Sequence, residues 1–387
     1  MAERAYARGQ QLAEQGHLTA AAEEFRKALL FAPENTDYRM SLATTLIDAG
    51  RLNEAQSHIE ELLQEDPTNA AVNLLRAKLA LKRNRLNLAI EYYQRAVYEY
   101  WPVSQAGQRR QARWELVDLL SQNGERSAVI AELMQLYSDA PQSAQERARI
   151  GSLLLSNGAT SEALRVFQDL AHQQPANAGA RVGLAEVYFA SGDFISARHE
   201  YQHAERLSPH DHQITESLAL TNEVIDMDPD LPSISGAERF RRSQNLLSRV
   251  VKDLRQCPAV PSPAGPPAPA SVSAPASNKF LEQLREKLPA PLGGKQKTAS
   301  PAGEKTAGGK SAGGNTSAAP TPAPSSIEQR LEAAQHLLAL PVKPNEDSAS
   351  ELRSAAQSLW QDRTQVCASS PINDHALESV MSRASHE

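Results

Sequence analysis

A step of 34 residues runs through the first half of the chain and constrains its fold more than any other feature. Glycine or asparagine recurs at this step, which a six-residue insertion at 104–109 interrupts once. The positions are Gly16, Gly50, Asn84, Gly124, Gly158 and Gly192. Because these residue types tolerate the left-handed backbone that ends one helix and allows a tight turn, we expect a helical hairpin around each of them.

Further columns of residues keep the same phase. A small side chain recurs five residues after each turn position, as Ala21, Ala55, Ala89, Val129, Ala163 and Ala197. An aromatic or aliphatic one follows four residues later, as Phe25, Ile59, Tyr93, Leu133, Phe167 and Tyr201. The small column lets two antiparallel helices approach closely, and the large column fills the space between hairpins. Each unit then ends at a proline, which stops the second helix.

These columns resemble the tetratricopeptide repeat, and the resemblance covers about residues 2–211. It implies an all-α fold, a right-handed α-solenoid of six helical hairpins. The units are 2–35, 36–69, 70–103, 110–143, 144–177 and 178–211. One hairpin cannot bury its apolar face alone, whereas stacked neighbours form a continuous core.

The rest of the chain is predicted to differ from the repeats. We expect two capping helices in 212–257, the second of which is rich in arginine and either faces solvent or docks to anionic membrane or RNA. Residues 258–325 hold 13 of the 24 prolines, and this composition predicts a disordered linker with one short helix at 278–288. In 326–387 we expect short helical segments of marginal order.

The family resemblance also implies a concave groove lined by the first helix of each hairpin. The residues that it places there are Tyr6, Gln10, Met40, Thr44, Leu74, Lys78, Trp114, Asp118, Ala148, Ser152, Val182, Glu186 and Phe189. Tyr6 and Gln10 stand where family members that clamp acidic chaperone tails have Lys and Asn, which disfavours that role. The apolar members suggest a stripe that binds a peptide, with Trp114 as an anchor. The alternative is that they pack between adjacent repeats.

One short motif raises the possibility of catalysis. His199, Glu200 and His203 satisfy the H-E-x-x-H pattern of zinc metallopeptidases, and Glu223 follows at a suitable distance for a third ligand. The repeat frame places the first three residues on the outer side of a second helix and Glu223 on the opposite, concave side. Since these side chains point to different faces, a solvated helix surface is the favoured interpretation and a metallopeptidase is the weaker alternative.

The sequence therefore favours a non-catalytic adaptor or scaffold, without a cofactor or metal, that binds a protein or peptide in its groove. The C-terminal helices are expected to recruit a second partner or to dock on the chain's own groove. A net charge of −10 for residues 1–230 and +4 for residues 231–387 argues against nucleic acid as a partner.

The start of the chain lacks the pattern of a secretory signal, so we expect a cytoplasmic protein with two unpaired thiols at Cys257 and Cys367. The alternative is an exported cell-envelope assembly factor, in which these cysteines are able to pair.

Overall fold

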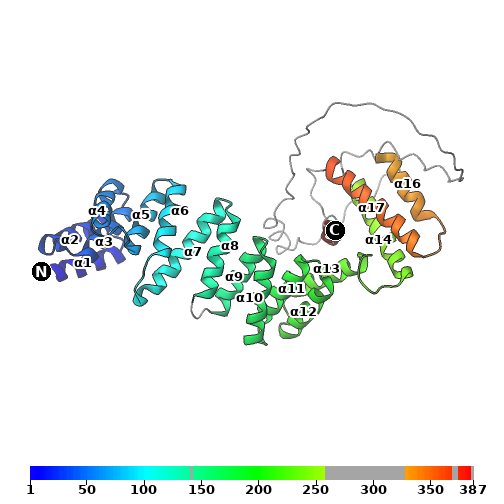
Figure 1. Cartoon of the computed structure of the whole chain (residues 1–387), viewed down its shortest axis with the longest axis horizontal. Helices are drawn as coiled ribbons and strands as arrows, with labels where there is room; N and C mark the ends of the chain where they lie inside the picture. Colours follow the sequence, from blue (N-terminus) through cyan, green and yellow to red (C-terminus); the bar gives the residue numbers. More distant parts are fainter. Residues whose placement is uncertain (140–142, 258–326, 368–373, 385–387) are drawn as a thin grey trace, which may run out of the picture. The chain divides into compact units, whose positions relative to one another are not determined.

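The computed structural model describes residues 1–139, 143–257, 327–367 and 374–384 (Figure 1). It divides into two compact units, Met1–Asn157 and Gly158–Glu387. The predicted linker at 258–325 and its short helix at 278–288 lie outside the described residues. Within the described ranges, no helix is long and apolar enough to cross a membrane.

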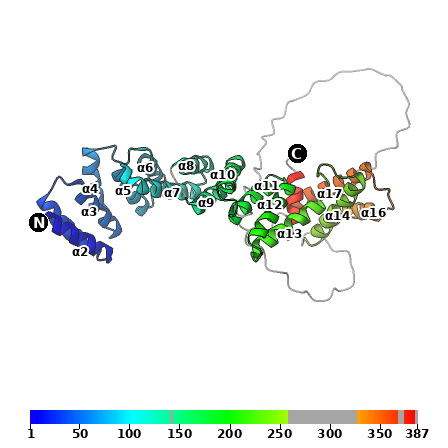
Figure 2. The same cartoon turned by 90° about the horizontal axis from the view of Figure 1, so that it is seen from below.

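The first unit is a succession of helices in which each packs against the next (Figures 1 and 2). Its helices are α1 (Ala2–Glu14), α2 (Leu18–Phe31), α3 (Thr36–Asp48), α4 (Leu52–Glu65), α5 (Ala70–Lys82), α6 (Leu86–Tyr98), the 3-10 helix η1 (Val103–Gln105), α7 (Ala106–Gln122), α8 (Arg126–Ser138) and α9 (Ala144–Ser156). Pairs such as α1 and α2 are the hairpins that the repeat predicts. The prediction of an all-helical repeat fold is confirmed.

The turns between paired helices have the predicted backbone. The glycines at the turn positions have φ between 74° and 84°, and Asn84 has φ of 57°. Side chains at the same 34-residue step also cap the first helices, where each accepts a hydrogen bond from a free backbone N–H. These caps are Asn35, Asn69, Ser143, Asn177 and Asp211. Residues close in sequence thus determine both the turn within each hairpin and the start of the first helix of the hairpins named here.

The predicted packing columns form the core. Every member of the small column, from Ala21 to Ala197, is fully buried, and every member of the large column, from Phe25 to Tyr201, is at most 2% exposed. Gly183 shows how tight this packing is, since a Cβ built on it would lie 2.1 Å from the ring of Phe167. Side-chain size at these positions therefore decides how closely the helices approach.

The fourth repeat contains a buried ion pair that the repeat pattern does not predict. Its insertion forms η1 and the first turn of α7, and Arg113 of this helix is fully buried. The Arg113 guanidinium donates to Glu132 at 2.8 Å, and the Tyr98 hydroxyl donates to the same carboxylate at 2.6 Å. Partial burial and this hydrogen bond raise the pKa of Tyr98. The charges are hydrogen-bonded, which makes their burial tolerable.

We expect the Arg113→Met variant to lose about 3–5 kcal/mol of unfolding free energy, because Glu132 then stays buried without its partner. The double variant Arg113→Met/Glu132→Met removes both charges and should lose less than the single variant. Urea unfolding followed by circular dichroism measures both. Equal losses in the two variants would show that Arg113 acts through its packing and not through its charge.

The second unit combines repeat helices with a C-terminal helical bundle. Its helices are α10 (Thr160–Gln173), α11 (Ala178–Ala190), α12 (Phe194–Leu207), α13 (His212–Met227), α14 (Gly236–Arg255), α16 (Ile327–Ala339), α17 (Glu346–Val366) and α18 (His375–Ala384). Figures 1 and 2 show α17 alongside α14, and these two helices pack extensively against each other. Leu247 and Val250 of α14 share one core with Leu352 and Leu359 of α17.

This bundle differs from the short, marginal segments that the sequence predicts for 326–387. Helix α17 is 21 residues long and begins with a capping box at Asn345 and Ser348. Its apolar residues pack against those of α14, more than 90 residues earlier in the chain. The apolar side of α14 therefore packs against α16 and α17 as well as α13, which the sequence does not predict.

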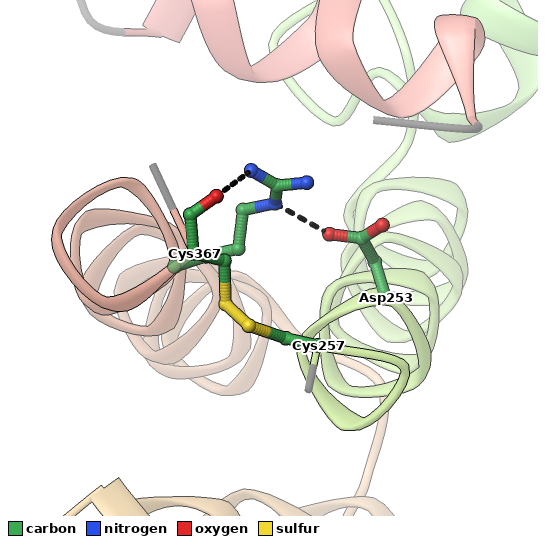
Figure 3. Close-up of a disulfide and its surroundings, with 4 residues drawn as sticks. Asp253, Cys257 and Cys367 are labelled. Atoms are coloured by element: carbon green, nitrogen blue, oxygen red, sulfur yellow. Dashed lines mark hydrogen bonds and ion pairs between the residues drawn. A yellow bond between two sulfur atoms is a disulfide. The ribbon is translucent and has the colours of Figure 1, made fainter. Parts of the chain in front are cut away.

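A disulfide joins the C-terminal ends of α14 and α17. Cys367 directly follows α17, and Gln256 separates Cys257 from the end of α14; the Cα atoms of the two cysteines lie 6.0 Å apart (Figure 3). Arg363 lies beside the bond and donates to Asp253 at 2.8 Å and to the backbone oxygen of Cys367. The expectation of two unpaired thiols is therefore wrong, because the packing of α17 on α14 brings together cysteines that are 110 residues apart.

Arginine–carboxylate pairs join the same distant segments. Those that link residues up to 257 with residues beyond 327 are Arg239 with Glu346, Arg249 with Asp374, Arg353 with Asp230, Arg363 with Asp253 and Arg383 with Asp228. Arg241 and Arg242 pair with Glu238 on their own helix. Four arginines of α14 therefore have carboxylate partners inside the second unit, namely Arg239, Arg241, Arg242 and Arg249. The sequence predicts no such partners for them, because it treats this face as solvated or as docked to a membrane or RNA.

Candidate functional site

The candidate site is the face that the first helices of the hairpins share. The structure divides its predicted residues into two rows that differ in exposure. The packed row, which is buried or half-buried, consists of Tyr6, Met40, Leu74 and Trp114. The polar row, four residues further along each helix, consists of Gln10, Thr44, Lys78, Asp118 and Ser152, all exposed except the half-buried Lys78. In the second unit, Glu186 and Phe189 of α11 are half-buried.

Tyr6 shows how the packed row joins neighbouring repeats. Its ring stacks on that of Tyr38 with 4.5 Å between centroids and lies 5.5 Å from that of Phe25. Its hydroxyl lies 3.1 Å from that of Ser41 on α3. Tyr6 and Met40 both pack against the core cluster that contains Phe25. These contacts fit the alternative in which apolar groove residues hold successive repeats together.

Trp114 is the most buried member of the packed row, at 8% exposure. Its indole N–H donates to Glu146 at 3.0 Å, and Arg110 donates to the same oxygen at 2.7 Å. Burial opposes ionisation of Glu146, but these two hydrogen bonds outweigh it and lower its pKa. The Arg149 guanidinium covers the ring, 4.0 Å from its centroid. Trp114 thus fastens α7 to α9, which fits the alternative in which apolar groove residues pack between adjacent repeats.

The polar row is the accessible part of this face. Its members occupy one position in the successive first helices α1, α3, α5, α7 and α9, so that they recur once per repeat. The row mixes amide, hydroxyl, ammonium and carboxylate groups. Asp118 lies 3.7 Å from Arg149, whose side chain is 53% exposed. Arg149 is not among the predicted groove residues, although it directly follows the predicted Ala148 in the sequence.

The H-E-x-x-H motif lies on α12, where the His199 Nδ1 atom lies 3.4 Å from the Glu200 Oε1 atom. Glu200, the base of the zinc motif, pairs with Arg181 at 3.1 Å and its side chain is only 13% exposed. The His199 side chain is 71% exposed, and Glu223 pairs instead with Arg249 at 3.7 Å. Partial burial and the positive charges of Arg181 and Arg206 lower the pKa of His203. Among the described residues, no three His, Cys, Asp or Glu side chains are grouped to hold a metal ion.

We expect Trp114→Ala to lower the unfolding free energy by about 3–5 kcal/mol, because it removes a buried ring and leaves a cavity between α7 and α9. Asp118→Ala, on the exposed side of the same helix, should change it by less than about 0.5 kcal/mol. Urea unfolding compares the two. If both variants unfolded like the native protein, the packing role of Trp114 would be refuted.

Comparison with known proteins gives matches to repeat proteins. The family model described as tetratricopeptide repeat matches residues 12–79, 46–100 and 154–232. The solved structure of YrrB, "a TPR protein with an unusual peptide-binding site", is 18% identical, covers 52% of this chain and 99% of its own, and gives a TM-score of 0.39.

Two further structures are similar to the same degree. A tetratricopeptide repeat protein from Parabacteroides merdae is 18% identical over 57% of this chain and 98% of its own, with a TM-score of 0.34. A repeat protein from Cytophaga hutchinsonii is 16% identical over 63% and 94%, with a TM-score of 0.41. No curated protein sequence matches the chain.

Proposed function

The chain is a tetratricopeptide-repeat protein, and we propose that it is a non-catalytic adaptor that binds a segment of another protein on the first-helix face of its repeats. The observation that carries the proposal is the division of this face into a packed row and a polar row. The packed row fixes each first helix against the next, so that the polar row is held in place before a partner arrives. A preorganised surface of this kind loses little entropy on binding.

The chemistry of the polar row suggests the kind of segment that it binds. Gln10, Thr44 and Ser152 present neutral donors and acceptors, whereas Lys78 and Asp118 carry opposite charges. An extended segment with free backbone groups and mixed side chains satisfies such a surface better than a uniformly acidic tail. The packed row supplies the apolar edge beside it.

One observation supports a role without catalysis. The glutamate of the zinc motif, Glu200, is held by Arg181 and is not presented to an open metal site.

The polar row can be tested by reversing its chemistry in the intact chain. In Gln10→Lys/Thr44→Lys/Asp118→Lys the helices should melt as in the native protein, because these residues are exposed. A matched control, Glu60→Lys/Gln64→Lys, changes exposed residues of the second helix α4. Proteins captured by the native chain from its own cells are quantified by mass spectrometry, and then the purified partner is titrated.

The expected result is a loss of affinity of about tenfold or more in the polar-row variant, with the control unchanged. Capture of the same partner with equal affinity by the native chain and both variants would refute binding on this face.

The disulfide favours the alternative of an exported protein over a cytoplasmic one, and we propose that the chain functions in an oxidising compartment. Disulfides between distant cysteines persist outside the reducing cytosol. The bond closes a loop of 110 residues, so Cys257→Ser should lower the unfolding free energy of the second unit by about 2–5 kcal/mol. Cys257→Ser/Cys367→Ser should match the single variant.

A non-reducing peptide map of the protein from its own cells, alkylated at lysis, decides the compartment. The Cys257–Cys367 peptide pair is expected in most of the molecules. Complete alkylation of both thiols would place the chain in a reducing compartment.

A further inference from the structure

Helix α18 attaches one apolar face to the end of the repeat array. Its residues Ala376, Leu377, Val380 and Met381 are at most 3% exposed and belong to one core cluster with residues of α13. The spacing i, i+1, i+4 and i+5 is that of an amphipathic helix with one buried stripe. Helix α18 packs more extensively against α13 than against α14 or α17.

The repeat frame shows which face of α13 this is. Helix α13 begins at His212, 34 residues after Ala178 begins α11, so it is the first helix of a seventh unit. At the same step, Leu220 of α13 corresponds to Glu186 and to the polar row, and Glu223 corresponds to Phe189. Both positions therefore belong to the face that the first helices use for binding.

The start of α18 lies against these positions. Leu220 and Glu223 line a cavity of about 330 Å³ together with Asp374, His375 and Ala376, and α14 supplies its other wall. Leu220 also packs against the core cluster that contains the buried stripe of α18. The last helix of the chain thus covers the seventh position of the polar row.

Charges hold both ends of α18. At its start, Asp374 accepts a hydrogen bond from Arg249 at 2.7 Å. At its end, Arg383 pairs with Asp228, which is 2% exposed. The side chain of Arg383 passes so close to Gly192 that a Cβ there would lie 3.1 Å from it. The position and direction of α18 on the array are therefore specified by its sequence.

We propose that α18 is an intramolecular ligand, which blocks the part of the first-helix face that α13 contributes until an amphipathic helix of the same pattern replaces it. The inference rests on the proposed function and names the partner of one part of that surface. The partner carries paired apolar residues four apart and an arginine one turn beyond them, to fit the place of Arg383 against Asp228. This is the helix-in-groove mode of recognition.

The build of α18 suits it to displacement. A helix of 10 residues is too short to be stable on its own, since about 12–15 residues are needed in water. Residues 368–373 separate it from Cys367, where the disulfide anchors α17 to α14. Helix α18 therefore stays tethered when it leaves the face, and its high effective concentration sets the affinity that a competitor needs.

A labelled peptide of residues 374–384 tests the proposal by fluorescence anisotropy. It should bind saturably to a chain that ends at residue 373, and about tenfold or more weakly to the full chain, whose face is occupied. The Val380→Asp peptide should not bind, whereas the Ser382→Ala peptide, changed at an exposed position, should bind like the native one. Failure of the native peptide to bind the shortened chain, or equal binding to both chains, would overturn the proposal.

Two measurements cover the case in which the shortened chain does not fold. The full-length Val380→Asp variant keeps every other residue and should bind the native peptide. In the native full chain, the amides of α18 should exchange with deuterium about tenfold or more faster than those of α17. Equal protection of the two helices would show that α18 is a fixed part of the core and not a ligand.

The outcome is independent of the polar-row experiment in the first unit. If the peptide fails but the polar-row variant still loses its partner, the self-ligand is refuted and the adaptor function remains. If the peptide binds and the polar-row variant has no effect, binding on the polar row of the first unit is refuted and the self-ligand remains.

Discussion

The close approach of two antiparallel helices at a small side chain is the constraint on which the repeat fold depends. Each hairpin needs a turn with positive φ, such as that at Gly50, and a crossing that only a small residue such as Ala55 allows. Repeated in phase, these two local requirements place every first helix in an equivalent position. The packed row, which includes Tyr6, and the polar row, which includes Gln10, arise because the same positions recur in successive repeats.

The repeat could be predicted from the sequence because its determinants are local and recur. Turn residues, caps and core columns each recur within one 34-residue unit, so several copies support the same conclusion. Arg113 could not be predicted as buried, because its partner Glu132 lies outside the repeat pattern and replaces apolar contacts that the pattern implies. Within the candidate site, the structure separates the buried Trp114 from the exposed Asp118. Helical spacing alone does not reveal which of the two a neighbouring helix covers.

The C-terminal bundle could not be predicted for a different physical reason. Its contacts join residues more than 100 positions apart, such as Arg363 with Asp253 and Cys257 with Cys367. No periodicity relates these residues, so nothing local in the sequence indicates that α14 and α17 pack against each other. Charge pairs and the disulfide determine which helices of the bundle pack together, as the repeated core columns do for the hairpins. The bundle gives the repeats an end that is built from the chain itself and packs α18 against α13.

The account's central claim is that side-chain size at the small column sets the helix crossings and thereby the whole binding face. The most direct test is the unfolding free energy of Ala55→Leu and Ala163→Leu, each compared with leucine at an exposed position of the same helix, Ser57→Leu and Ser161→Leu. The account predicts that the two alanine variants lose about 1–3 kcal/mol or more, since the added atoms force the helices apart, whereas the serine variants change by less than about 0.5 kcal/mol. Alanine variants as stable as their serine controls would contradict it.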